Sequence, residues 1–237
     1  MRILILGDSH TGVLHKALEA IRERSEADPA CDITARQLCG GHHLREAFWR
    51  EAGDHAEIIE PLCRKHCTRL PPEEPVDALG LCMPLWPMRV VRKLVLGELS
   101  LVERVRGRQS ISRAAFRRMV SDDQQHILGL AAYLSGKGNR VFAVSAPGLF
   151  RDHVILKRAD PSTVLGIFEA FREVVRDQLH GLGIDIVDIP SECLDGEGFM
   201  KSQFRHRDPD DEHHANIAFG ELMIRGIERW ARDTGRL

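Results

Sequence analysis

The sequence contains no long apolar run, few aromatic residues and no excess of charge of either sign. Phe, Trp and Tyr make up 5% of its 237 residues, and the formal net charge is −2. A membrane-spanning helix needs about 20 mostly apolar residues, and no stretch approaches that length. A nucleic-acid-binding protein usually carries a clear basic excess. We therefore expect no membrane span, no nucleic acid partner and a largely aliphatic core.

The first residues also lack the pattern of a secretion signal. The apolar run Ile3-Leu4-Ile5-Leu6 is only four residues long, whereas the apolar part of a signal peptide has about 7–15 residues. We therefore predict a cytoplasmic protein whose six cysteines are reduced thiols. The length fits one α/β domain over residues 1–237. The oligomeric state stays open.

Short buried-strand patterns alternate with helical patterns along the chain. Strands are expected at residues 3–6, 32–38, 77–82, 140–145 and 185–189. Helices are expected at residues 11–23, 44–51, 122–134, 161–181 and 215–231, with two more within 89–118, while 53–75 should be irregular apart from a short strand at 58–59. This alternation predicts a three-layer α/β/α sandwich around a parallel sheet. Such sheets bind ligands at the carboxyl ends of their strands.

A basic helical insertion is expected at about residues 87–120. Nine Lys and Arg lie between residues 89 and 118, with two acidic residues, Glu98 and Glu103. One interpretation is the solvated face of two helices. The other is a cap over the strand ends that would favour an anionic substrate. The apolar stripe of the first helix would consist of Val91, Val95, Leu99 and Val102.

Gly7-Asp8-Ser9-His10 is predicted to be a turn between the first strand and the first helix. Unpaired N–H groups and the positive end of the helix dipole would lie beside Ser9, where they suit a developing oxyanion. A serine hydroxyl is a weak nucleophile until a base removes its proton. The alternative is a purely structural role, in which Asp8 and Ser9 only cap the helix. If Ser9 is a nucleophile, a histidine must come from elsewhere in the chain.

Asp211 and His214 are the best candidates for that base and its carboxylate partner. They are three residues apart, just before the final helix. On a turn this spacing lets the carboxylate accept the Nδ1–H of the imidazole and leaves Nε2 free for Ser9. A charged helix start is the alternative interpretation of the same residues.

Together these two segments resemble the SGNH (GDSL-type) hydrolase superfamily. The resemblance lies in Gly7-Asp8-Ser9-His10 after the first strand and in Asp211-x-x-His214 near the end of the chain. It implies a flavodoxin-like five-stranded parallel sheet, with Ser9 as nucleophile, His214 as base and Asp211 as its orienting carboxylate. His10 departs from the family pattern, which usually has leucine at that position.

The resemblance also implies an oxyanion hole, and here the sequence departs further. The family's oxyanion glycine would be Gly40 or Gly41, after the second strand. Its oxyanion asparagine should follow the third strand, where this chain has Gly80-Leu81-Cys82-Met83-Pro84-Leu85-Trp86. Loss of one such donor typically costs roughly 10²–10³ in kcat. The candidates for substitution or for lining the pocket are Asp8, His10, His42, His43 and Arg151.

The resemblance implies a serine esterase or deacetylase that acts on a small ester, such as an O-acetyl group. If the basic segment caps the site, an ester of an anionic carbohydrate would be favoured. The same residues would serve an O-acyltransferase if the acceptor were a hydroxyl group. The main alternative, favoured by the missing asparagine, is a non-catalytic binding or assembly protein of the same fold. No cofactor is expected.

A Cys/His cluster in the first third of the chain supports a competing metalloprotein hypothesis. Thiolate and imidazole are the donors that zinc prefers. Cys39 and His42 lack the regular paired spacing of a zinc site. Because free buried cysteines are also common, we expect no metal. The residues of this cluster are Cys39, His42, Cys63, His66 and Cys67.

Overall fold

A five-stranded parallel sheet forms the centre of the protein, in the strand order β10-β9-β6-β1-β2. The computed structural model describes residues 1–26, 28, 30–101 and 106–235. Every pair of neighbouring strands in this sheet is parallel. The predicted flavodoxin-like sheet is therefore confirmed. Its strands are β1 (Arg2–Gly7), β2 (Asp32–Gln37), β6 (Ala78–Cys82), β9 (Val141–Val144) and β10 (Asp185–Val187).

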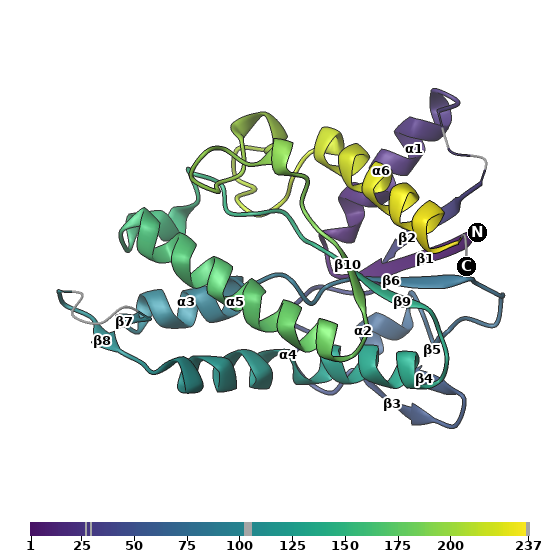
Figure 1. Cartoon of the computed structure of the whole chain (residues 1–237), viewed down its shortest axis with the longest axis horizontal. Helices are drawn as coiled ribbons and strands as arrows, with labels where there is room; N and C mark the ends of the chain where they lie inside the picture. Colours follow the sequence, from purple (N-terminus) through teal and green to yellow (C-terminus); the bar gives the residue numbers. More distant parts are fainter. Residues whose placement is uncertain (27, 29, 102–105, 236–237) are drawn as a thin grey trace.

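Helices cover both faces of the sheet, as a three-layer sandwich requires (Figure 1). One face carries α1 (Thr11–Glu23) and α6 (Ile217–Thr234). The other carries α3 (Met88–Leu96), α4 (Arg113–Gly136) and α5 (Pro161–Gly181). The buried side chains form two clusters, one with α1 and α6 and one with α3, α4 and α5. Short 3₁₀ turns lie at Val154–Lys157, Ser191–Cys193 and Ser202–Phe204.

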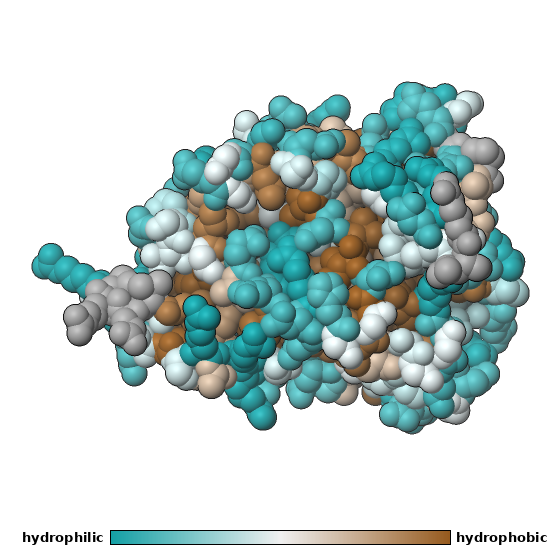
Figure 2. All heavy atoms as spheres, in the orientation of Figure 1, coloured by the Kyte–Doolittle hydropathy of each residue, from teal (hydrophilic) through white to brown (hydrophobic). Residues whose placement is uncertain are grey.

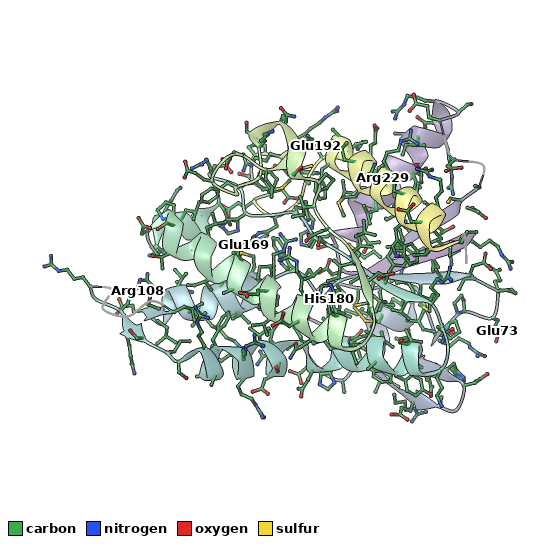
Figure 3. The ribbon with its side chains drawn as sticks, in the orientation of Figure 1. Glu73, Arg108, Glu169, His180, Glu192 and Arg229 are labelled. Atoms are coloured by element: carbon green, nitrogen blue, oxygen red, sulfur yellow. A yellow bond between two sulfur atoms is a disulfide. The ribbon has the colours of Figure 1, made fainter. Side chains whose placement is uncertain are left out.

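The outer surfaces of the helical layers are polar. Figure 2 shows one face covered mainly by hydrophilic side chains, with hydrophobic groups visible between them. Glu169 and His180 on α5 and Arg229 on α6 are exposed there (Figure 3). Among the described residues, no helix is long and apolar enough to cross a membrane.

The segment between β2 and β6 differs from the prediction. It forms no helix at residues 44–51 but a three-stranded antiparallel sheet, with a short helix. The reason is a hairpin, because Ala52 pairs with His55 across a two-residue turn in which Gly53 has φ +74°. A glycine adopts that backbone conformation without strain. The elements of the segment are β3 (Trp49–Ala52), β4 (His55–Ile58), α2 (Pro61–Arg64) and β5 (Arg69–Leu70).

The basic segment also differs in its helix boundaries. α3 forms where one helix was predicted, but the second predicted helix and the one at 122–134 are a single helix, α4. The Ser112 side chain caps this helix by accepting the N–H of Ala115, and no proline interrupts it. Between α3 and α4 lie the short strands β7 (Leu99–Ser100) and β8 (Gln109–Ser110). Val102, predicted to join the apolar stripe, lies outside the described residues.

Close packing of α1 against α6 brings the two ends of the chain together. A Cβ at Gly220 of α6 would lie 2.7 Å from the carbonyl oxygen of Val13 and 2.8 Å from the Cβ of Ala17, both on α1. Only glycine allows the two helices to approach this closely. As a result, the loop that precedes α6 lies over the turn that precedes α1.

Candidate active site

The turn after β1 is fixed by contacts with the neighbouring strand. A Cβ at Gly7 would lie 2.0 Å from the carbonyl oxygen of Cys82 at the end of β6, so only glycine fits. The Asp8 N–H donates to that oxygen at 3.2 Å, and the Asp8 carboxylate accepts the N–H of His10 at 2.9 Å. Ser9 is thereby held at the carboxyl end of β1, one residue before the helix cap.

Ser9, His214 and Asp211 form a continuous hydrogen-bonded chain. The Nε2 of His214 lies 2.8 Å from the Ser9 Oγ, although 205 residues separate the two in sequence. The Nδ1 of His214 lies 2.9 and 2.8 Å from the two carboxylate oxygens of Asp211. A proton on Nδ1 satisfies Asp211 and leaves the lone pair of Nε2 to accept the Ser9 hydroxyl proton. This geometry is that of a nucleophile with its base.

Asp211 is strongly stabilised as a carboxylate. Partial burial pushes its pKa upward, but the backbone N–H groups of His214 and His213 and the imidazole of His214 outweigh burial and lower the pKa to about 2. These N–H groups donate to Asp211 Oδ1 at 2.9 and 3.0 Å. The carboxylate is therefore charged at neutral pH and can balance a positive charge on His214.

Two further residues of the turn, Asp8 and His10, are buried beside Ser9. Burial raises the pKa of Asp8 to about 7, against the opposing effects of the His10 N–H and of Arg89. Burial, and then the nearby charges of His214 and His213, lower the pKa of His10 well below its ordinary value. The His10 ring lies between Trp86 and His214, with centroid distances of 4.2 and 4.8 Å. A neutral imidazole thus forms one wall beside Ser9.

The loop after β2 that carries Gly40 and Gly41 is held by a side chain from α3, on the face of the sheet opposite to α1 and α6. Arg89 of α3 donates to the carbonyl oxygen of Gly41 at 2.7 Å and forms an ion pair with the buried Asp123 of α4 at 2.9 Å. A Cβ at Gly41 would lie 3.3 Å from the Asp8 carboxylate. Gly41 is therefore placed next to the Ser9 turn, as the predicted oxyanion glycine should be.

No asparagine follows β6, and the structure places Trp86 there instead. The Trp86 ring packs on His10 and lines the cavity beside Ser9. The sequence has two asparagines, Asn139 and Asn216. The Asn216 side chain caps α6 at the N–H of Phe219 and donates to a backbone carbonyl, so its hydrogen-bonding groups are already used.

Two cavities meet at Ser9. The larger, of about 600 Å³, extends between α1 and α6 and includes His214 and Asp211. The smaller, of about 380 Å³, lies on the other side of Ser9. Its lining residues come mainly from the loops after β1, β2 and β6 and from α3. They include Asp8, His10, Gly41, His42, Trp86 and Arg92.

Three of the predicted pocket residues have other contacts. His43 faces the Glu60 carboxylate at 3.3 Å, and His42 rather than His43 lines the smaller cavity. Gly40 lines neither cavity; its carbonyl oxygen accepts the N–H of His43. Arg151 forms ion pairs with Asp195 and Glu197 and is likewise absent from both cavities.

The prediction that all six cysteines are reduced thiols is contradicted by a disulfide between Cys39 and Cys63. The bond joins the segment after β2 to α2, elements that sequence patterns alone could not bring together. Glu60 lies close to both sulfur atoms, but sulfurs joined in a disulfide are not available as thiolate ligands. Cys67, also a candidate ligand, is a free thiol that donates to the carbonyl oxygen of Arg69.

Comparison with known proteins supports the fold but not a close relationship. No family model and no curated protein matches the sequence. Among solved structures, an acetyl xylan esterase is 13% identical with a TM-score of 0.52, covering 97% of this chain and 98% of its own. An acetyl-xylooligosaccharide esterase from Geobacillus Stearmophilus, in mutant form, is 12% identical with a TM-score of 0.51, covering 96% and 92%.

A GDSL-like lipase from Bacteroides thetaiotaomicron is 9% identical, with a TM-score of 0.50, and covers 99% of this chain and 88% of its own. The chain therefore has the fold of the SGNH (GDSL-type) hydrolases, as its two terminal motifs predicted. Identities this low establish the architecture alone.

Sequence reasoning missed several residues that the structure brings to Ser9. Arg89 and Asp123 could not be paired from patterns, because nothing in the sequence shows that α3 and α4 meet behind Gly41. His213 is also absent from the predicted site residues. Its position next to the candidate base was the one available signal, since the backbone that presents His214 must also place His213 near the cavity.

Proposed function

We propose that the protein is a serine esterase of the SGNH type that cleaves a small ester through an acyl-serine intermediate. The observation that carries this proposal is the hydrogen-bonded chain from Ser9 Oγ through His214 to Asp211, with distances of 2.8 Å at both steps. The two esterase neighbours named above are an acetyl xylan esterase and an acetyl-xylooligosaccharide esterase. An acetyl group on a carbohydrate is therefore our first candidate substrate.

In the proposed mechanism, His214 Nε2 takes the Ser9 proton as Oγ attacks the ester carbonyl carbon. The tetrahedral oxyanion is held by the backbone N–H groups of Ser9 and Gly41. As the intermediate collapses, His214 gives the proton to the departing alkoxide and leaves the acyl group on Ser9. Water, deprotonated by His214, then releases the acid and restores the serine.

Transfer to a hydroxyl acceptor would use the same acyl-serine, with a sugar hydroxyl in place of water. Such an O-acyltransferase is the nearest variant of the proposal. A non-catalytic binding protein is the second candidate, and the position of Trp86 where an oxyanion asparagine would stand favours it. The intact contact between Ser9 and His214 favours the enzyme.

Hydrolysis of 4-nitrophenyl acetate tests the proposal. We expect the wild type to release 4-nitrophenol with an initial burst, and Ser9→Ala to lose at least about 10³-fold in kcat. Ser202→Ala, which removes an exposed serine hydroxyl outside both cavities, should retain wild-type activity. Equal turnover by the wild type and Ser9→Ala would contradict the assignment of the nucleophile.

A further inference from the structure

The smaller cavity beside Ser9 is rich in cationic side chains. Arg45, Arg89, Arg92 and Lys93 all line it, together with the two carboxyl groups of Asp8 and Asp123. Asp123 is neutralised by its ion pair with Arg89. Within the described residues, none of the other three cations forms an ion pair with a carboxylate. The cavity therefore carries excess positive charge on the same side as Gly41.

A chain of hydrogen-bonding groups that do not match ends at this cavity, where Arg92 and His213 line it. The Ile155 N–H donates to Nδ1 of His153 at 3.0 Å. Nε2 of His153 lies 3.0 Å from Nδ1 of His213, and Nε2 of His213 lies 3.1 Å from a guanidinium nitrogen of Arg92. A donor stands at each end of this chain, with two imidazoles between the donors.

Neutral imidazoles cannot satisfy all three of these contacts. Each imidazole carries one N–H and one lone pair, whereas a backbone N–H and a guanidinium can only donate. His153 must accept from Ile155, so its Nε2 carries the hydrogen and donates to His213. His213 then carries its own hydrogen on Nε2. Two donors, the His213 Nε2–H and the Arg92 guanidinium, consequently face each other.

The surroundings confine this mismatch to the cavity end of the chain. His153 is 2% exposed, so its bond to the Ile155 N–H is shielded from water, whereas Arg92 is exposed. Burial, followed by the charges of Arg92 and His214, lowers the pKa of His213, which keeps its imidazole neutral. The Trp86 ring meets the His213 ring edge-on at 5.8 Å and limits its rotation.

We propose that Arg92 and His213 together bind an anionic group of the substrate, a carboxylate or phosphate oxygen that accepts from both donors. An oxygen anion between them turns the opposed N–H groups into two charge-assisted hydrogen bonds. Arg45 and Lys93 add positive charge around it. This proposal rests on the proposed esterase function, because the anion site and Ser9 line the same cavity. It makes the substrate an acidic ester.

Two pairs of matched esters test this assignment. In the first pair, 4-nitrophenyl hydrogen succinate and its methyl ester, the charge is on the acyl side. In the second, 4-acetoxybenzoate and methyl 4-acetoxybenzoate, it is on the leaving-group side. The quantity measured is the ratio of kcat/KM for the charged ester to kcat/KM for its neutral partner.

We expect the wild type to prefer the charged ester in at least one pair, and Arg92→Gln to reduce that preference by roughly tenfold or more. Arg92→Lys should keep part of it, because it retains the charge but not the fork. Arg118→Gln is the matched control, since it removes an equal charge from an exposed side chain of α4; its ratio should equal that of the wild type. A wild-type ratio near one in both pairs, or an unchanged ratio in Arg92→Gln, would overturn the proposal.

Calorimetric titration with inorganic phosphate separates this proposal from the esterase function. If no ester is hydrolysed, the proposed function fails, but binding of phosphate still tests the anion site. We expect Arg92→Gln to weaken phosphate binding roughly tenfold or more relative to the wild type and to Arg118→Gln. Equal affinity in Arg92→Gln and the wild type, or no binding by the wild type, would overturn the anion site whatever the activity.

Discussion

The two sides of Ser9 are built differently. On one side, Asp211 and His214 come from a single short loop. Their hydrogen bonds to each other and to Ser9 have the arrangement that a catalytic base requires. On the other side, Gly41 comes from the loop after β2, whereas Trp86 and Arg92 come from the stretch that runs from β6 into α3, and the asparagine typical of the fold is missing. The groups proposed to transfer the proton are thus closer to the family pattern than the groups that would contact the substrate. Reactivity and specificity can therefore be tested separately.

The largest effect is expected from Asp211→Asn, on the side that follows the family pattern. An asparagine amide can donate to His214 Nδ1 and so favour the tautomer that carries its hydrogen on Nε2. That nitrogen then cannot accept the proton of Ser9. We expect kcat for 4-nitrophenyl acetate to fall roughly 10³–10⁴-fold. Asp210→Asn, an exposed neighbour, is the matched control. A loss below about tenfold would show that Asp211 does not orient the base.

On the other side, Arg89→Met should be strongly destabilising. The Asp123 side chain is 1% exposed and would lose its cationic partner, and removing one member of a buried pair typically costs about 3–5 kcal/mol. Urea unfolding measures the loss, and Arg118→Met provides the exposed control. Asp123→Asn added to Arg89→Met should restore part of the stability. A change below about 1 kcal/mol would mean that this pair does not support the Gly41 side.

Asp8, which lies between the two sides, should make stability depend on pH. Its folded-state pKa of about 7 exceeds its ordinary value of 3.8, so the folded protein binds a proton that the unfolded chain releases. Stability should therefore fall as pH rises from about 4 to 7, by up to about 4 kcal/mol, and level off above that. Asp8→Asn should flatten this decline in urea unfolding. Identical slopes for the two proteins would refute the raised pKa.

The Cys39–Cys63 disulfide supports the segment that carries Gly41. Its cysteines are 24 residues apart, and closing a loop of this size contributes about 3 kcal/mol. Thiol titration of the denatured, unreduced protein should find four free thiols, and six after reduction. Reduction should lower stability to urea, and Cys67→Ala should leave the disulfide intact. Six free thiols before reduction would show that the disulfide is absent and that all six cysteines are reduced, as expected for a cytoplasmic protein.

The central sheet and the contact between Asp211 and His214 could be predicted because their signals are local. Buried runs such as Ile3–Leu6 mark parallel strands, and the spacing of Asp211 and His214 fixes their contact within one turn. Both motifs also lie next to helices whose apolar faces are clear in the sequence.

The remaining parts of the site depend on contacts that local patterns do not encode. The hairpin at Gly53 could not be predicted, because the polar segment around it, with several prolines, shows no clear strand pattern. Arg89 reaches Gly41 only because α3 packs behind the loop after β2. The mismatch between His213 and Arg92 depends on ring orientations that only the folded structure defines.

Labelling with a fluorophosphonate tests whether Ser9 is a nucleophile activated by His214. The reagent forms a covalent bond with an activated serine, and mass spectrometry locates it. We expect one adduct on the wild type, on the peptide that contains Ser9, and none on Ser9→Ala. An adduct that persists in Ser9→Ala would show another nucleophile, and a wild type without any adduct would favour the binding protein over the esterase.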